Sequence, residues 1–521
     1  VRGGNNSVEI RVSETPVYAY SERIDFLFLM NNHSLYRLKP RIDKKTIILG
    51  KSDFITEDDH KLYGSQFHEL NVEDLAAEAG SVLFGNTILF GFIMGMLGIK
   101  CGFAQELIAN KFTDKNERIQ NGNQVAYTSG HLLGANYSHM CDVSPHEINT
   151  VFKTLSGTEA VGIGALAGGC NFVSAYPMSP STGVLIYMAE NSKAFGVVVE
   201  QAEDEIAALN MVIGSWYAGA RGLATTSGGG FALMEEAVSL SGITETPFVL
   251  HLAQRPGPGT GLPTRTGQED LNLVVYSGHG EFPKIVLAPG HLKDGIELTS
   301  RAFYLADKYQ VPVFVLTDQF YLDSKGQMEA YDISDENLTS FVVKTDADYK
   351  RYRVGKNGLS PRGIPNNGQG LVKCDSDEHD ENGMITESFD VRVTMTDKRL
   401  SKEALLLEDY TQPELIGPTD YKHLLVGWGS TYGVINEYIL NDDRNDTAFL
   451  YIKQPYPLAP SLKSYFDQAE LIINIENNAT GQLGGLLKLK LDVKTTSSIL
   501  KYNGEPFSIE ELNLKIKEVL A

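Results

Sequence analysis

Three consecutive acids, Glu203, Asp204 and Glu205, follow the apolar run AFGVVVEQ and open the helix-like stretch EDEIAALNM. Acidic side chains suit a helix N-terminus, because they meet the partial positive charge of the helix dipole. A carboxylate at the end of a buried strand is equally suited to general acid–base catalysis. The pattern therefore leaves two interpretations open, a helix terminus and a catalytic acid.

A hydroxyl group is the second candidate. Ser179 lies in YPMSPST, residues 176–182, between Pro177 and Pro180. The two proline rings restrict the backbone on both sides of it. A helix N-cap accounts well for Ser181 or Thr182 but poorly for such a rigidly placed Ser179. We therefore expect Ser179 to face a ligand.

The third candidate is the irregular stretch QRPGPGTGLPTRTGQED, residues 254–270, which contains Arg255, Thr260, Thr264 and Arg265. An arginine at the end of a strand suits a carboxylate, which it binds with two parallel hydrogen bonds. A surface loop with solvated arginines is the alternative, although loops of this length in compact domains tend to be functional. Nearby, the turn TSGGGF lets the backbone approach a ligand closely, but it does not match the GxxxxGK[ST] motif of nucleotide-binding loops.

These loops need a scaffold that brings them together. From about residue 150 to residue 345, apolar runs alternate with helix-like stretches, a pattern that predicts a parallel sheet. The strands of such sheets are buried on both faces, and ligands bind beyond their carboxyl ends. We therefore expect the four loops to converge on one crevice.

The rest of the chain suggests further α/β units. Residues 346–417, including SPRGIPNNGQGLVKCDSDEHDENG, read as a connecting segment, and residues 418–521 as a last α/β unit. The uncharged stretch at residues 80–99 is long enough to span a membrane. Its Gly85, Gly91, Gly95 and Gly98 favour instead a buried helix at a domain or subunit contact. The chain begins without Met, so we expect its N-terminus to be incomplete.

Composition excludes several classes of partner. The formal net charge of -21 argues against nucleic acid, since phosphate binding needs clustered Lys and Arg. The four cysteines are scattered without a CxxC pair, which argues against a cysteine-ligated cluster in this chain and fits the cytoplasm. We expect no membrane partner.

In this order, the motifs resemble the α subunit of 2-oxoacid:ferredoxin oxidoreductases with a γ domain fused ahead of it, most closely the 2-oxoglutarate:ferredoxin oxidoreductases. The resemblance covers nearly the whole chain and rests on these motifs: YPMSPST, QAEDEIAA, SWYAGARGLATTSGGGFALMEEA, QRPGPGTGLPTRTGQEDL, SPRGIPNNG, LLVGWGSTYG and NIENNATGQL. It implies a multi-domain α/β fold with four parts: a γ domain at 1–149, a doubly wound parallel-sheet domain of the pyrimidine-binding type at 150–345, the connecting segment at 346–417, and a transketolase-C-like domain at 418–521. Two features depart from the family pattern: the chain starts beyond the place where the family's GxGGQG-type turn should lie, and Ser179 replaces a threonine.

The resemblance also implies roles for the candidates. Glu205, with small residues behind it and Gly214 later in the helix, matches the acid that faces the aminopyrimidine ring of thiamine diphosphate; Glu203 is the alternative if the alignment shifts by two. Arg255 matches the residue that pairs with the substrate's 1-carboxylate, and Thr264 and Ser179 match its hydroxyl helpers.

The sequence contains no GDG motif. The resemblance therefore implies that Mg²⁺ and the [4Fe-4S] cluster lie on a β subunit in an (αβ)₂ assembly, with ferredoxin docking mainly on β. The implied reaction converts a 2-oxoacid, with 2-oxoglutarate the favoured substrate, and coenzyme A to acyl-CoA, CO₂ and reduced ferredoxin. A pyruvate- or branched-chain-specific homologue, a non-catalytic scaffold and a self-sufficient thiamine enzyme remain the alternatives.

Overall fold

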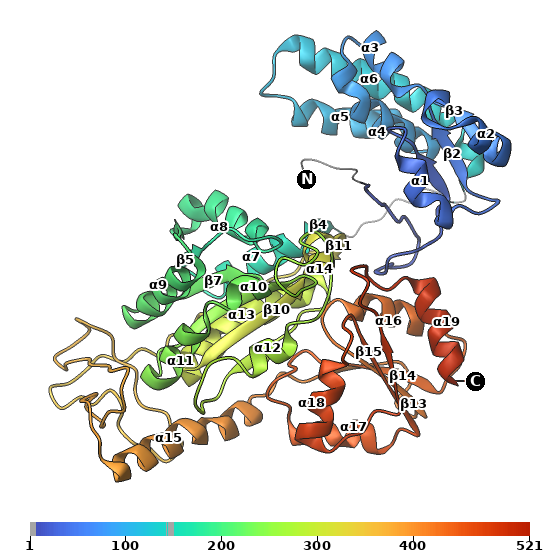
Figure 1. Ribbon diagram of the computed structural model, residues 1–521. Coiled ribbons are helices and arrows are strands. Elements are labelled where there is room, and N and C mark those ends of the chain that lie inside the picture. The colour runs from blue at the N-terminus through green and yellow to red at the C-terminus, as the bar shows by residue number, and fades with distance from the viewer. Residues whose placement is uncertain (1–6, 142, 144–150, 521) are drawn as a thin grey trace. The chain divides into compact units, whose positions relative to one another are not determined.

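The computed structural model describes residues 7–141, 143 and 151–520, and the chain divides into two compact units (Figure 1). Unit 1 comprises Val1–Val17 and Ser21–Thr150, and unit 2 comprises Tyr18–Tyr20 and Val151–Ala521. The predicted boundary at residues 149 and 150 lies outside the described residues.

Unit 1 is a small parallel α/β domain with a three-stranded sheet in the order β1-β2-β3. Its strands are β1 (Phe26–Phe28), β2 (Ile47–Gly50) and β3 (Phe67–Glu69). Its helices are α1 (Ser34–Leu38), η1 (Lys39–Arg41), η2 (Ser52–Phe54), α2 (Glu57–Tyr63), α3 (Val72–Glu78), η3 (Val82–Phe84), α4 (Gly85–Met96), α5 (Cys101–Lys111), α6 (Glu117–Ala135) and η4 (Ser138–Met140). The α/β character predicted for this part of the chain is therefore present.

The apolar stretch at residues 80–99 forms η3 and α4, and α4 packs closely against α6. A Cβ atom at Gly91 or Gly95 would lie 2.2 Å from a backbone oxygen of α6, and one at Gly134 would lie 2.0 Å from the backbone oxygen of Phe92. Glycine is therefore required on both helices. The predicted close backbone approach occurs, but its partner is a helix of the same unit. Among the described residues, no helix combines the length and apolar character needed to cross a membrane.

The centre of unit 2 is a six-stranded sheet, all parallel, in the order β6-β5-β7-β8-β10-β9. Its strands are β5 (Phe172–Ala175), β6 (Val198–Gln201), β7 (Gly222–Thr226), β8 (Phe248–Gln254), β9 (Ile285–Leu287) and β10 (Pro312–Asp318). Every residue of β7, β8, β9 and β10 is buried. The chain leaves β5 toward β6 on one side and returns to β7 on the other, so the strand order reverses between β5 and β7.

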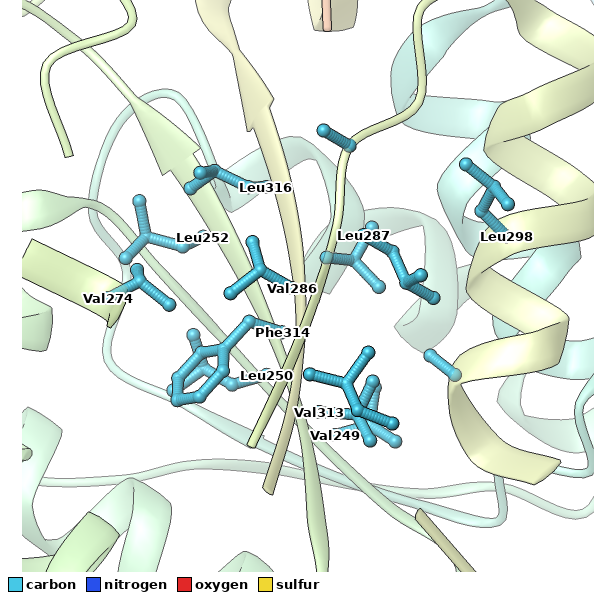
Figure 2. Packing of buried hydrophobic residues seen from close by; sticks show 14 of the residues in the cluster. Val249, Leu250, Leu252, Val274, Val286, Leu287, Leu298, Val313, Phe314 and Leu316 are labelled. Atoms are coloured by element: carbon cyan, nitrogen blue, oxygen red, sulfur yellow. The ribbon is translucent and has the colours of Figure 1, made fainter. Parts of the chain in front are cut away.

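Helices cover both faces of this sheet, as expected for right-handed crossovers. They are α7 (Gly157–Ala167), α8 (Thr182–Phe195), α9 (Glu205–Tyr217), α10 (Gly228–Phe231), α11 (Glu235–Thr244), α12 (Leu271–Val275), α13 (Leu292–Tyr309) and α14 (Gln319–Asp323). Helices α7, α8 and α13 pack together, and α9 packs with α11. Figure 2 shows the apolar core, in which side chains of β8, β9 and β10 meet Val274 of α12 and Leu298 of α13. The prediction of a doubly wound parallel sheet is confirmed.

The remainder of unit 2 comprises a two-stranded sheet, the 346–417 segment and a five-stranded second sheet. The two-stranded sheet is antiparallel and pairs β4 (Phe152–Ser156) with β11 (Lys325–Glu329). The segment is not all loop, because it contains the helix α15 (Phe389–Glu408) and the strand β12 (Glu414–Ile416). The second sheet has the order β12-β14-β13-β15-β16, with only β12 antiparallel to its neighbour. Its remaining strands and the helices around it are β13 (His423–Gly427), α16 (Thr431–Leu440), β14 (Thr447–Tyr451), η6 (Pro460–Leu462), α17 (Lys463–Asp467), β15 (Leu471–Glu476), α18 (Gln482–Leu491), β16 (Ser497–Leu500) and α19 (Ile509–Leu520). The short helix η5 (Asp335–Leu338) packs instead against α7 and α13.

Candidate active site

Four loops leave the carboxyl ends of β5, β6, β7 and β8, and these are the four loops that the sequence singled out. Parallel sheets bind ligands outside the carboxyl ends of their strands, at the point where the strand order reverses. In this sheet that point lies between β5 and β7, which precede YPMSPST and TSGGGF respectively. The topology therefore selects this edge as the candidate site.

The three acids after β6 have three different environments. Glu203 is exposed, whereas Asp204 is the N-cap of α9 and its Oδ1 accepts a hydrogen bond of 2.7 Å from the backbone N–H of Ala207. Aspartate is a preferred N-cap residue, because its carboxylate satisfies a free N–H of the first turn. Glu205 is the first residue of the helix and is only 4% exposed. Asp204 therefore caps the helix through its side chain, whereas the Glu205 side chain is buried in the protein.

Glu205 lies against the glycine turn that follows β7. Its Oε1 atom is buried and has no hydrogen-bond partner among the described residues. A Cβ atom at Gly230 would lie 2.8 Å from both Oε1 and Cγ of Glu205, so this approach requires glycine at position 230. A buried carboxylate oxygen without a partner is costly. The arrangement thus favours a partner that comes from outside the chain.

Two more unpartnered oxygens lie at this turn, one within it and one contributed by the loop at residues 254–270. Ser227 is buried, and its Oγ lacks a hydrogen-bond partner among the described residues, as does Oδ2 of Asp270. A Cβ atom at Gly228 would lie 2.5 Å from that Oδ2 atom. Three buried oxygens without a partner therefore surround the turn at residues 227–230, which makes it the part of the site best suited to a polar ligand.

Asp270 ends the loop at residues 254–270, but nothing in the sequence distinguishes it as a site residue. Burial, followed by the neighbouring Glu269 carboxylate, raises the pKa of Asp270 to about 7, against an opposing effect of the Arg255 guanidinium. Asp270 directly precedes the apolar helix α12, so it resembles an ordinary N-cap, yet its side chain makes no capping hydrogen bond. Its place beside Gly228 depends on the packing of the loop after β8 against the loop after β7, which are far apart in the sequence.

The structure joins Arg255 to the first loop. Arg255 follows β8, and its Nη1 donates a hydrogen bond of 2.8 Å to the backbone oxygen of Ser179. The contact uses the carbonyl group of Ser179, whose side chain is exposed. Ser181 stands at the N-cap of α8, but its hydroxyl donates to the oxygen of Met178 instead of capping the helix. Of the two N-cap candidates, Ser181 and Thr182, Ser181 therefore occupies the N-cap position, but its hydroxyl closes the loop on itself.

Thr264 is exposed on the loop at residues 254–270, and no hydrogen bond joins it to Arg255 or Ser179 in the described part of the chain. Its neighbour Thr266 is buried and donates to Oδ1 of Asp318 at 3.0 Å. The structure thus hydrogen-bonds Arg255 to Ser179, whereas no such bond joins Thr264 to either of them in the described part of the chain.

The end of this loop is fixed to the second sheet of unit 2. Gln268 is fully buried; its backbone N–H donates to the oxygen of Asn477 at 2.7 Å and its Nε2 donates to the oxygen of Trp428 at 2.7 Å. Gln482 donates to the oxygen of Glu269 and accepts from the N–H of Asn272. The motifs LLVGWGSTYG and NIENNATGQL therefore supply the groups that hold the segment around Asp270.

The described residues contain no cluster of three or more His, Cys, Asp or Glu side chains that could hold a metal ion. The four cysteines, all described, are unpaired.

Two family models match the chain. Residues 163–398 match the model described as pyruvate flavodoxin/ferredoxin oxidoreductase, thiamine diP-bdg, and residues 1–131 match the model described as pyruvate ferredoxin/flavodoxin oxidoreductase. The first match contains all four loops of the site.

Curated relatives resemble the chain over most of its length. The α subunit of 2-oxoacid:ferredoxin oxidoreductase 1 from Sulfurisphaera tokodaii is 36% identical over 448 residues, which cover 82% of this chain and 70% of the relative. The 2-oxoglutarate oxidoreductase subunit KorA from Mycobacterium tuberculosis is 30% identical and covers 84% of this chain and 68% of the relative. A solved structure of 2-oxoglutarate:ferredoxin oxidoreductase from Magnetococcus marinus, with 2-oxoglutarate, coenzyme A and succinyl-CoA bound, is 28% identical. It superimposes with a TM-score of 0.90 over 98% of this chain and 90% of that chain.

Proposed function

Because the chain belongs to the family of 2-oxoacid:ferredoxin oxidoreductase α subunits, we propose that it forms, with a β subunit, an enzyme that oxidises 2-oxoglutarate. The reaction yields succinyl-CoA and CO₂ and transfers electrons to ferredoxin. The choice of 2-oxoglutarate is supported by relatives named for that substrate and by the 2-oxoglutarate and succinyl-CoA bound in the Magnetococcus structure.

The observation that carries the proposal is the unpartnered Oε1 of Glu205 beside Gly230. A carboxyl group at this position fits a heterocycle with a ring nitrogen that exchanges a proton. Glycine at position 230 lets the Glu205 carboxyl group lie directly against this turn, because an added Cβ would be 2.8 Å from its Oε1 atom. Thiamine diphosphate, when bound, supplies the electron sink for decarboxylation. Glu205 would hold or release the proton at its Oε1 atom.

Arg255 is the group we assign to the substrate's 1-carboxylate. A guanidinium has five N–H donors, and one of them is engaged by the oxygen of Ser179. This hydrogen bond directs the Arg255 side chain from the loop after β8 toward the loop after β5. The bound carboxylate orients the 2-oxo carbon, so the role of Arg255 is positioning. We also assign the hydroxyl groups of Ser179 and Thr264 to the substrate's 1-carboxylate, as hydrogen-bonding partners beside Arg255.

We further propose that Mg²⁺, the diphosphate-binding residues and the [4Fe-4S] cluster belong to the β subunit, since this sequence has no GDG motif. The assembly is proposed to be (αβ)₂, with ferredoxin docking mainly on β because the net charge of this chain is -21. Four unpaired cysteines suit the reducing cytoplasm.

The test is an assay of the chain copurified with its β subunit, using a low-potential electron acceptor and a panel of 2-oxoacids with and without coenzyme A. We expect CoA-dependent turnover, highest with 2-oxoglutarate. Pyruvate or a branched-chain 2-oxoacid as the best substrate would refute the assigned specificity. Absence of turnover with every 2-oxoacid would refute the proposed activity.

The matched variants are Glu205→Gln and Glu203→Gln, because both remove one carboxylate from the same loop but only Glu205 is buried. Glu205→Gln is expected to lower kcat by about 10²- to 10⁴-fold, the usual range for a lost acid–base group. Glu203→Gln is expected to retain activity. Full activity of Glu205→Gln in the assembled complex would indicate a scaffold subunit.

A further inference from the structure

The Oδ2 atom of Asp270 lies at the glycine turn, next to Gly228, and accepts no hydrogen bond from the described residues. We propose that Asp270 controls substrate binding at this site, because its carboxyl group must be uncharged when the carboxylate of the 2-oxoacid binds at Arg255. This inference rests on the proposed function and extends it, because it assigns a role in substrate recognition to a second acid.

The backbone of Asp270 is held from two directions. Its N–H donates a hydrogen bond of 3.0 Å to Oε1 of Gln254, which is fully buried and itself donates to the oxygen of Thr317. The residues on either side are fixed by Gln482, which contacts the oxygen of Glu269 at 2.7 Å and the N–H of Asn272 at 2.8 Å. The side chain is therefore placed firmly without the help of its own Oδ2.

An aspartate at the start of a helix ordinarily accepts a hydrogen bond from the first turn, but Asp270 does not cap α12. Its carboxyl group lies instead against Gly228, where an added Cβ would be 2.5 and 2.6 Å from its two oxygens. Gly228 belongs to the same turn as Gly230, which contacts Glu205. A purely structural role does not account for a carboxyl group in this place with a buried free oxygen.

The charges around Asp270 decide its effect on an anionic ligand. Within its own loop, Glu269 opposes ionisation and Arg255 favours it. The neighbours contributed by other elements are uncharged, namely Gly228 of α10, Gln254 of β8 and Gln482 of α18. Ionised Asp270 would compete with a substrate carboxylate for Arg255 and repel it, whereas neutral Asp270 would leave Arg255 available.

The ionisation of Asp270 determines how KM for the 2-oxoacid changes with pH. The pKa of Asp270 is raised to about 7, so the free site is mostly neutral at Asp270 below this pH and mostly ionised above it. A bound carboxylate disfavours the ionised form further, so binding above pH 7 requires uptake of one proton from solvent by the Asp270 carboxylate. We therefore expect KM for the 2-oxoacid to rise by up to about tenfold per pH unit above 7, with kcat much less affected.

The experiment measures kcat and KM of the α–β complex for its preferred 2-oxoacid between pH 6 and 9. It compares the wild type, Asp270→Asn, and Glu203→Gln as the control for loss of one acid on the same sheet edge. The amide of Asp270→Asn imitates the neutral carboxyl group, so its KM is expected to stay nearly constant over this range. Glu203→Gln is expected to follow the wild-type profile.

A second measurement does not depend on turnover. The complex prepared without thiamine diphosphate is titrated with the 2-oxoacid at pH 8 by calorimetry in buffers of different ionisation enthalpy. The wild type is expected to take up close to one proton per bound substrate, and Asp270→Asn close to none. Equal proton uptake by the two proteins would overturn the inference.

A wild-type KM that stays constant from pH 6 to 9 would also overturn it, and this result does not depend on whether Asp270→Asn folds. Failure of the proposed function is a separate outcome, since it would appear as absence of 2-oxoacid turnover by the wild type even at pH 6.5.

Discussion

Glu203, Asp204 and Glu205 have nearly the same chemistry and three different environments. Glu203 precedes α9, Asp204 is its extended N-cap residue and Glu205 is its first helical residue, so one or two positions separate an exposed acid from a helix cap and a buried carboxylate. Only Glu205 reaches the glycine turn after β7. The choice of Glu205 over Glu203 as the cofactor-facing acid is a proposal that this geometry supports.

At the residue scale, the turn itself offers a test. Gly230→Ala would place a methyl carbon 2.3 Å from Oγ1 of Thr226 and 2.8 Å from Oε1 of Glu205. We expect the Glu205 carboxylate to be displaced and kcat of the α–β complex to fall by about 100-fold, the scale expected for misplaced catalytic groups. Steady-state kinetics measures this loss, and thermal unfolding separates it from lost stability.

Gly229 is the matched control. A Cβ atom there would meet nothing closer than the backbone oxygen of Gly259 at 3.8 Å. Gly229→Ala is therefore expected to keep kcat within a few-fold of the wild type. If both variants lost activity equally, flexibility of the turn and not its contact with Glu205 would be the important property.

At the scale of elements, the α4–α6 pair depends on glycine in the same way. Gly134→Ala would place its methyl carbon 2.0 Å from the backbone oxygen of Phe92. A backbone atom cannot turn aside, so the helices must separate, at a cost of about 1–3 kcal/mol for overpacking. We expect local opening of α4 and α6 to increase by about 5- to 150-fold.

Hydrogen exchange of peptides from α4 and α6 measures this opening. Fluorescence would miss it, because both tryptophans, Trp216 and Trp428, lie in unit 2. Gly102→Ala on α5 is the control, since a Cβ there meets nothing within 4 Å and alanine favours a helix over glycine by about 1 kcal/mol. Equal protection in Gly134→Ala and the wild type would show that the helix pair tolerates the methyl group.

At the scale of the whole molecule, the chain is proposed to be one half of an active site. It offers Glu205 and the glycine turn for a ring, but its sequence has no GDG motif for a diphosphate and Mg²⁺. We expect the isolated chain to bind thiamine diphosphate and Mg²⁺ no tighter than about 1 mM, and the α–β complex to bind them at about micromolar concentrations or below. Isothermal titration calorimetry on both samples measures the difference.

Glu205→Gln should weaken binding of thiamine diphosphate to the complex without preventing assembly with β, which size-exclusion chromatography checks. Tight binding of thiamine diphosphate and Mg²⁺ by the isolated wild-type chain would contradict the division between subunits. It would instead support a self-sufficient thiamine enzyme.

The motifs in the sequence were sufficient for the family and the fold class, and both predictions are confirmed by the similar proteins. The family followed from the resemblance of these motifs, whereas local signals were sufficient for the fold class because apolar strands, glycine turns and acidic helix starts reflect short-range physics. The 20-residue helix α15 was not predicted, although it contains no Gly, Pro or Asn, because the loop-like composition of residues 360–383 was extended to the whole segment. The contact partner of the apolar stretch at residues 80–99 was likewise decided by α6.

The sequence by itself determined the kinds of groups available at the sheet edge: an acid after β6, glycines after β7, and an arginine after β8. Only the tertiary structure decided which of these groups meet. It set Glu205 against Gly230, joined Arg255 to the carbonyl group of Ser179, left Thr264 exposed, and brought Asp270 to Gly228. The physical reason is that burial and unpartnered oxygens arise where segments far apart in the chain pack together, and no local pattern records that packing.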